Sequence, residues 1–277
     1  MVSEASVFFM LVTLFISLVL PVVLLIVYAV KNKGKKIVSA WFLGAAGFFV
    51  LQIVLRLPIL SVLSLMPGFQ SFAENNYVIY ILLLAFTAGL FEVIGRFAVA
   101  KIMSKNLTYE RSIAAGLGHG GIEAMILIGL TYVSNLLYAA MINGGTFDTV
   151  VEQAKALGVD VSSLLVLKDS LITSPSYLFG LAGYERILTI ICHTAMSLLV
   201  CYFVYKKQTM KGVLIALVLH TVLDSVSGLV SGMSTPYMGS VISQNTAYIL
   251  IYGFLTIMAV ISVVIILRIK KKFTKEA

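Results

Sequence analysis

The sequence predicts an all-α, polytopic membrane protein with about seven transmembrane helices. Of its 277 residues, 60% are hydrophobic and only 12% are charged, and the mean hydropathy is +1.03. A soluble chain of this size cannot bury so much apolar surface. The apolar residues gather into runs that are each long enough to cross a hydrocarbon core of about 30 Å. The shortage of polar sequence excludes a soluble nucleotide-binding or DNA-binding domain, so we expect a single integral membrane domain over residues 1–277.

The expected spans follow the apolar runs in order along the chain. They are residues 7–30, 38–65, 77–100, 112–142, 183–205, 211–231 and 246–268. The first run lacks a basic leader and is too long for the apolar part of a signal peptide, so we expect a retained helix. The second run carries Arg56 near its outer end, a position typical of an interfacial anchor.

Charged side chains mark the third and fifth spans. In the third run, Glu92 and Arg96 are four residues apart and therefore share one helix face. They either neutralise each other or form a clamp for a substrate near a metal. Glu185 and Arg186 open the fifth run near the outer surface, where we expect an ion pair at the boundary of the span.

The link between the fourth and fifth runs, residues 143–182, is predicted to be an outer loop. Within it, residues 149–157 and 162–171 could form short amphipathic helices on the outer surface, or a lid. Pro175 and the pair Gly180 and Gly183 are expected to separate this loop from the fifth span.

The basic residues predict the orientation in the membrane. Fifteen of the 20 lysines and arginines lie in the links after the first, third and fifth runs and in the C-terminal tail. Because cytoplasmic links carry an excess of positive charge, the N-terminus is predicted outside and the C-terminus inside. An odd number of spans agrees with this arrangement. Contact with the cytoplasmic leaflet also explains the net charge of +8, and no nucleic-acid partner is expected.

The three histidines of the chain are the strongest functional signal. His119, His193 and His220 all fall inside predicted spans, where an unpaired polar side chain is costly. At a rise of about 1.5 Å per residue, they lie about 12 to 20 Å from the cytoplasmic edge. Glu123 follows His119 by four residues. Asp224 follows His220 at the same spacing, so each pair shares a helix face and could bind one ion, or one side chain could orient the other.

Imidazole and carboxylate groups are ligands that Zn²⁺ prefers, with a fourth position left for water. The expected metal ligands are therefore the three histidines and one acidic residue: His119, His193, His220 and Asp224. Asp224 is either a ligand itself or the group that orients a ligand. Glu123 is the expected general base, and Glu92 and Arg96 support the site. Such a set supplies the water and the electrophile for peptide hydrolysis in a membrane. A single histidine inside a span more often forms a hydrogen bond between helices, so the prediction of a metal site depends on all three histidines together.

Glycines surround His119 in the segment GHGGIEA. Gly116, Gly118, Gly120 and Gly121 leave one face of the helix nearly bare. Two interpretations are open at this point: close packing against neighbouring helices, and room for a substrate backbone beside the metal.

GHGGIEA, the histidine of the fifth span and the segment HTVLD together resemble the YhfC-type intramembrane metalloproteases of bacteria. More distantly, they resemble the CPBP superfamily, which includes the type II CAAX prenyl proteases, and the PrsW-like proteases. The superfamily pattern contains Phe-x-x-x-His followed by His-x-x-x-Asn or Asp. His193 matches the first of these motifs, with Thr189 where the Phe stands, and His220 with Asp224 matches the second.

The superfamily pattern begins with Glu-Glu-x-x-x-Arg, and this motif has two candidate matches. Glu92-x-x-x-Arg96 fits its second half, with Phe91 in place of the first Glu. Glu123 is the second candidate for the motif glutamate, but Leu127 occupies the position at which the motif has its arginine. The resemblance implies a catalytic glutamate on one of these two helices, and Glu123 is preferred because His119 is beside it.

These residues and the resemblance together imply a zinc-dependent intramembrane endopeptidase, a multi-pass protein of a bacterial plasma membrane. Its partners would be the lipid bilayer and a membrane-embedded or membrane-tethered protein or peptide substrate. Two other classes stay open. Buried histidines and carboxylates also form proton relays in proton- or ion-coupled permeases. A non-enzymatic scaffold or immunity protein could retain the fold without binding a metal.

Overall fold

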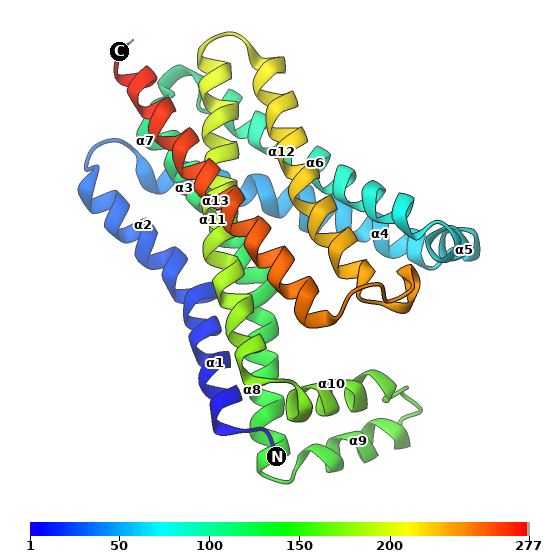
Figure 1. Cartoon of the computed structure of the whole chain (residues 1–277). Coiled ribbons are helices and arrows are strands. Elements are labelled where there is room, and N and C mark those ends of the chain that lie inside the picture. The colour runs from blue at the N-terminus through cyan, green and yellow to red at the C-terminus, as the bar shows by residue number, and fades with distance from the viewer. Residues whose placement is uncertain (276–277) are drawn as a thin grey trace. The chain divides into compact units, whose positions relative to one another are not determined.

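The computed structural model describes residues 1–275, and every regular element in that range is a helix (Figure 1). Seven helical segments in it are long and apolar enough to cross a membrane: Glu4–Lys31, Ile37–Ser64, Tyr77–Ile102, Tyr109–Asn143, Ser176–Tyr205, Thr209–Met233 and Gln244–Phe273. The predicted all-α fold with seven spans is therefore confirmed. The predicted orientation of the termini stays a prediction.

The helices that make up these spans and their links are numbered in chain order. They are α1 (Glu4–Leu14), α2 (Leu20–Lys31), α3 (Ile37–Phe48), α4 (Leu57–Ser64), α5 (Pro67–Asn75), α6 (Tyr77–Ile102), α7 (Tyr109–Glu123), α8 (Leu130–Asn143), α9 (Phe147–Ala156), α10 (Ser162–Thr173), α11 (Ser176–Tyr205), α12 (Thr209–Met233) and α13 (Gln244–Lys275).

Three of the spans contain a π-helical segment: Phe15–Val19, Phe49–Arg56 and Ala124–Gly129. Such a segment widens the helix locally and changes the direction in which the following side chains point, and it often occurs at functional sites. The second segment carries two polar side chains, Gln52 and Arg56. The third begins directly after Glu123. Both segments therefore bear on the candidate site described below.

The contacts of the chain divide it into two compact units. The first contains Met1–Val23 and Ala124–Ile187, and the second contains Leu24–Glu123 and the chain from Leu188 onward. The single integral domain predicted from the sequence stays a prediction beside this division.

In the first unit, α1 packs against the start of α11. The hydroxyls of Thr13 and Tyr132 both donate to the carbonyl oxygen of Phe179, at 2.6 and 3.0 Å. A Cβ atom at Gly180 would lie 2.7 Å from the ring of Phe9, and one at Gly183 would lie 2.7 Å from Thr13 Oγ1. The expectation that these glycines break the chain before the fifth span is therefore wrong. They lie inside α11 because α1 approaches too closely for a side chain.

The long link of the first unit contains the two predicted short helices, α9 and α10, which lie side by side (Figure 1). Phe147 and Val151 of α9 pack with Val161 in a small apolar core. Lys168 of α10 reaches Asp148 of α9 at 2.5 Å. These contacts hold the two helices together as a hairpin.

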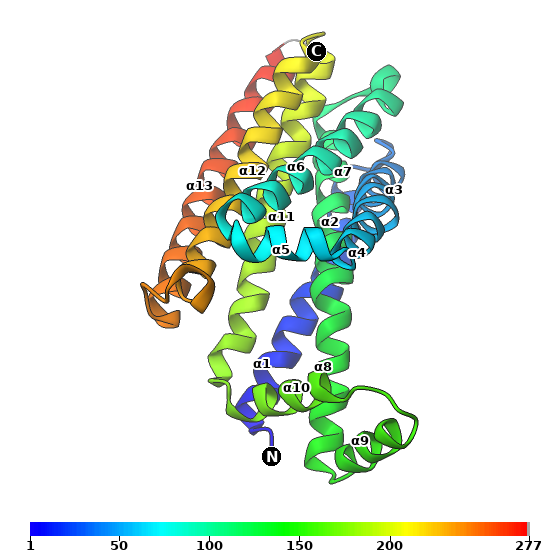
Figure 2. The same ribbon diagram turned by 90° about the vertical axis from the view of Figure 1, so that its right-hand side faces the viewer.

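The second unit contains α3, α6, α7, α12 and α13 together with the later part of α11, from Leu188. Val93, Ala115, Met196, Leu223 and Met258 are members of its main apolar core. Helices α12 and α13 run beside each other (Figure 2). The core thus joins residues that are far apart in the sequence, and it surrounds the buried histidines.

Glycines bring α3, α7 and α11 to backbone contact around His119. A Cβ atom at Gly118 would lie 1.9 Å from the carbonyl oxygen of Trp41 on α3. On the opposite side, Cβ atoms at Gly116 and Gly120 would lie 2.6 and 3.0 Å from Cα atoms of α11. The packing interpretation of this glycine-rich face is confirmed at these three positions. The close approach places His119 between two neighbouring helices.

Candidate metal centre

The centre of the candidate site is the carboxylate of Glu92 on α6, whose side chain is only 4% exposed. Three nitrogen atoms converge on its Oε2 atom: His119 Nε2 at 3.0 Å, His220 Nε2 at 2.8 Å and an Arg96 terminal nitrogen at 3.0 Å. These groups come from α7, α12 and α6. Three helices thus supply polar groups to one oxygen atom.

Gln52, from the π-helical segment of the second span, contacts the other oxygen of Glu92. Its amide nitrogen donates to Oε1 at 2.7 Å. Both oxygens of the buried carboxylate therefore accept hydrogen bonds, as a buried charge requires. Sequence reasoning missed Gln52. The available signal was a glutamine four residues before Arg56 on one face of an apolar run.

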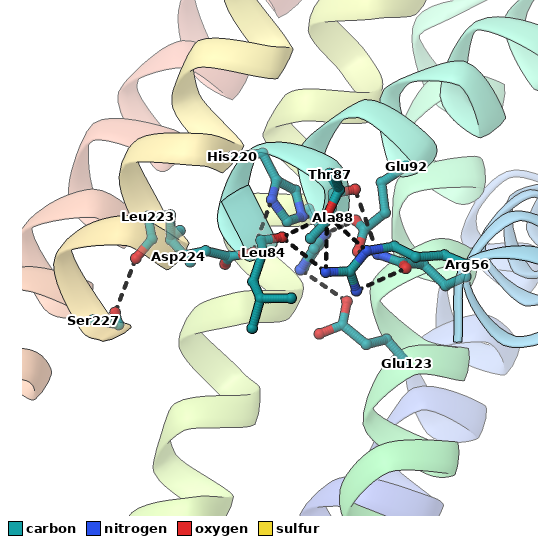
Figure 3. Close-up of polar contacts among 12 residues, drawn as sticks. Arg56, Leu84, Thr87, Ala88, Glu92, Glu123, His220, Leu223, Asp224 and Ser227 are labelled. Carbon is teal, nitrogen blue, oxygen red and sulfur yellow. Dashed lines mark hydrogen bonds and ion pairs between the residues drawn. The ribbon is translucent and has the colours of Figure 1, made fainter. Parts of the chain in front are cut away.

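Arg56 holds Gln52 in place. Its guanidinium donates to Gln52 Oε1 at 3.3 Å, to the Leu84 carbonyl oxygen at 2.8 Å and to Thr87 Oγ1 at 3.3 Å (Figure 3). The sequence interpretation of Arg56 as an interfacial anchor misses these inward contacts. The chain of contacts from Arg56 through Gln52 to Glu92 connects the second span to the centre of the site.

His193 on α11 has a defined orientation of its two ring nitrogens. A terminal nitrogen of Arg96 lies 2.5 Å from its Nδ1 atom. Because arginine can only donate, Nδ1 is the acceptor, and in a neutral imidazole the other nitrogen carries the hydrogen. That nitrogen, Nε2, lies 2.8 Å from Glu123 Oε2. The lone pair of Nδ1 thus faces Arg96, and Glu92 Oε2 lies 3.5 Å from the same nitrogen.

Aromatic contacts help to fix the imidazole rings. The rings of His119 and His193 stack, with centroids 5.3 Å apart and planes inclined by 23°. Phe48 of α3 contacts the ring of His119 edge to face at 5.3 Å. The histidines are therefore held by ring packing as well as by the carboxylate.

Asp224 lies at the rim of the cluster. Its Oδ2 atom is 3.3 Å from His220 Nδ1, at ion-pair distance, and its side chain is 32% exposed (Figure 3). Asp224 thus contacts the outer nitrogen of His220, while the inner nitrogen contacts Glu92. This position matches the predicted orienting role more closely than the predicted role of ligand.

The donor set fits a metal ion. One ligand atom from each of Glu92, His119, Glu123 and His193 lies within 4.8 Å of the other three, and all four residues are buried. With zinc at about 2.0 to 2.2 Å from its ligands, neighbouring atoms of a tetrahedral site are about 3.3 Å apart. The three imidazole nitrogens lie 2.8, 3.0 and 3.5 Å from Glu92 Oε2. Spacing, ligand type and burial all suit a metal.

The structure brings six of the predicted site residues into contact: Glu92, Arg96, His119, Glu123, His193 and His220. The seventh, Asp224, joins them through His220. The predicted pair of Glu185 and Arg186 forms an ion pair within the first unit.

The family of YhfC intramembrane metalloproteases matches this chain over residues 16–243. The chain belongs to this family. Another protein, the uncharacterized membrane protein YhfC of Bacillus subtilis strain 168, is 31% identical over 225 residues, which cover 81% of this chain and 84% of that protein. No solved structure matches the chain significantly. All members of the cluster lie inside the range that the family matches. The seven spans and the similarity to a membrane protein show that the chain is a multi-pass membrane protein.

Proposed function

We propose that the protein is a zinc-dependent intramembrane endopeptidase that hydrolyses membrane-embedded or membrane-tethered peptides. The observation that carries this proposal is the buried convergence of imidazole and carboxylate groups on Glu92 Oε2. It occurs in a chain whose family is described as intramembrane metalloproteases. Burial within the spans suits a substrate that is itself in the bilayer.

Three histidines would hold the metal: His119, His193 and His220. His119 and His220 would bind it through Nε2, and His193 would bind it through Nδ1, which would then exchange its hydrogen bond from Arg96 for the metal. Ligating histidines commonly donate their other ring N–H to a carboxylate, which fixes the ring. The carboxylate that contacts the other ring nitrogen is Asp224 for His220 and Glu123 for His193. Zinc bound there would lower the pKa of a water molecule and polarise the scissile carbonyl.

Glu123 is the better candidate for the general base. Glu92 accepts hydrogen bonds from Gln52 on one oxygen and from the charged Arg96 on the other, so Glu92 has little capacity left for a proton. Glu123 lies at the edge of the cluster, and its side chain is 10% exposed. It can accept a proton from water and stay in contact with His193 at 2.8 Å. Arg96 then neutralises Glu92.

Elemental mass spectrometry of the detergent-purified protein tests this proposal. We expect about one zinc per chain for a single structural or catalytic site, and loss of zinc when His119, His193 and His220 are all replaced by alanine. Lys155→Ala is the matched control and should keep the metal, because the Lys155 side chain on α9 is 50% exposed. Absence of metal from protein prepared without chelators would overturn the proposal.

A proton-coupled permease is the second candidate, and one observation favours it. Titratable side chains form a continuous series from Asp224 through His220, Glu92 and His193 to Glu123. Such a series could pass protons, and Arg96 balances the charge of Glu92 at 3.0 Å. Metal-free protein that acidifies proteoliposomes down an applied potential would favour this function.

A further inference from the structure

Arg96 has polar atoms that the cluster does not use. One terminal nitrogen contacts Glu92 and His193. Its Nε and its other terminal nitrogen are buried and have no hydrogen-bond partner among the described residues. Ser197 Oγ on α11 is buried without such a partner as well. Leaving these atoms unpaired in the membrane interior is costly, because each loses its contact with water on folding.

A small cavity lies beside these atoms. It has a volume of about 10 Å³ and is lined by Arg96, Ser197 and His119 together with Gly44, Val99, Ala115 and Cys201. This is room for about one water molecule, which needs two to four polar partners to be held stably. We call it the Arg96–Ser197 cavity. It shares Arg96 and His119 with the candidate metal centre.

Water suits this cavity better than an anion does. A water molecule can accept hydrogen bonds from the guanidinium and can donate to or accept from the Ser197 hydroxyl. The positive charge of Arg96 is already matched by Glu92 at 3.0 Å, so an added anion would be an unpaired buried charge. The cavity also has room for about one water molecule and not for a larger ion.

We propose that the Arg96–Ser197 cavity holds a resident water molecule, and that this water is the reserve from which the hydrolytic site is supplied. The second part rests on the proposed protease function. The hydrocarbon around a hydrolase in a bilayer supplies no water, whereas a polar cavity against the cluster keeps a molecule at hand. Ser197 is then a water-binding residue whose hydroxyl forms no hydrogen bond with the carboxylates or rings of the cluster.

The chain contains a matched control cavity. It has the same volume of about 10 Å³ and is lined by Cys192, Met196, Leu219, Leu223, Met258, Ile261, Ser262 and Ile265. Its lining is almost wholly apolar, and cavities of that kind stay dry. The two cysteines of the chain, Cys201 and Cys192, are both 2% exposed. Each therefore reports on one of two cavities of equal size.

Radiolytic hydroxyl-radical labelling measures the water beside each cysteine. Radicals formed from a bound water oxidise a neighbouring thiol even where bulk solvent is excluded. In the wild-type protein we expect Cys201 to be oxidised severalfold faster than Cys192. Ser197→Ala, which removes one partner of the water, should slow the oxidation of Cys201, and Ser197→Val, which also fills its space, should slow it further. The rate at Cys192 should not change.

Equal protection of both cysteines in the wild-type protein would overturn the proposal, and this comparison needs no variant. Fast oxidation of Cys201 that is unchanged in both Ser197 variants would overturn the assignment of the water to Arg96 and Ser197. Zinc content, measured on the same samples, should stay at the wild-type value in Ser197→Ala. A protein that contains zinc but protects Cys201 refutes the resident water alone. A protein that lacks zinc refutes the protease function and the reserve role that rests on it, while the labelling of Cys201 still decides whether the water is present.

Discussion

Replacing Gln52 with leucine is expected to weaken zinc binding by about 10- to 100-fold, the usual effect of removing a group that orients a metal site. Gln52 contacts none of the proposed histidine ligands in the hydrogen bonds described, yet it donates to Glu92 Oε1 at 2.7 Å. Leucine keeps the approximate size of the side chain and removes the amide. Glu92 Oε1 then loses its donor, and Arg56 loses one of its acceptors.

The magnitude follows from the burial of this contact. An unsatisfied buried acceptor costs about 1 to 3 kcal/mol, and a charged one costs more. A 10- to 100-fold change in a dissociation constant corresponds to about 1.4 to 2.8 kcal/mol. The two ranges of free energy agree. Loss of Gln52 affects the metal site because its hydrogen bond holds the carboxylate of Glu92 where Oε2 meets the imidazole nitrogens.

Competition with a chromophoric chelator measures the zinc affinity of each variant. Gln70→Leu is the matched control: Gln70 is exposed on α5 and donates only to the Ser64 carbonyl oxygen, at 2.8 Å. It should bind zinc as the wild type does. If Gln52→Leu also keeps the wild-type affinity while its metal is still held by the histidines, the argument that Gln52 positions Glu92 is refuted.

Three further predictions concern catalysis, packing and topology. Glu123→Gln should keep zinc but lower peptide hydrolysis by about 10²- to 10⁴-fold, measured on a fluorogenic transmembrane peptide; unchanged turnover would exclude Glu123 as the base. Gly118→Ala should destabilise the protein by about 1 to 3 kcal/mol, seen as a lower Tm, because its Cβ would lie 1.9 Å from the Trp41 carbonyl oxygen. Gly253→Ala is the control for this variant and should not lower the Tm, because a Cβ atom at Gly253 would meet nothing beyond its own helix within 4 Å. A C-terminal alkaline phosphatase fusion should be inactive, whereas a C-terminal fluorescent protein should fold, because the basic tail is predicted to be cytoplasmic; an active phosphatase would reverse the topology.

The sequence by itself determined the membrane class, the seven spans and the chemical types at the site. Hydropathy is a local sum, so runs of apolar residues identify spans without knowledge of their neighbours. Histidines inside such runs are informative because hydrocarbon cannot satisfy them. His119, His193 and His220 were therefore recognised together. The four-residue spacing of His220 and Asp224 also predicted a contact that the structure contains at 3.3 Å.

Only the tertiary structure decided which groups meet, and it placed Glu92 rather than Glu123 at the centre. The rotation of each helix about its axis determines this, and one extra residue in a turn changes the direction of a side chain by about 100°. The π-helical segment Phe49–Arg56 directs Gln52 toward Glu92, and the backbone contact at Gly118 sets the position of His119. Both depend on atoms from other helices. Hydropathy and spacing along one helix contain no information about them.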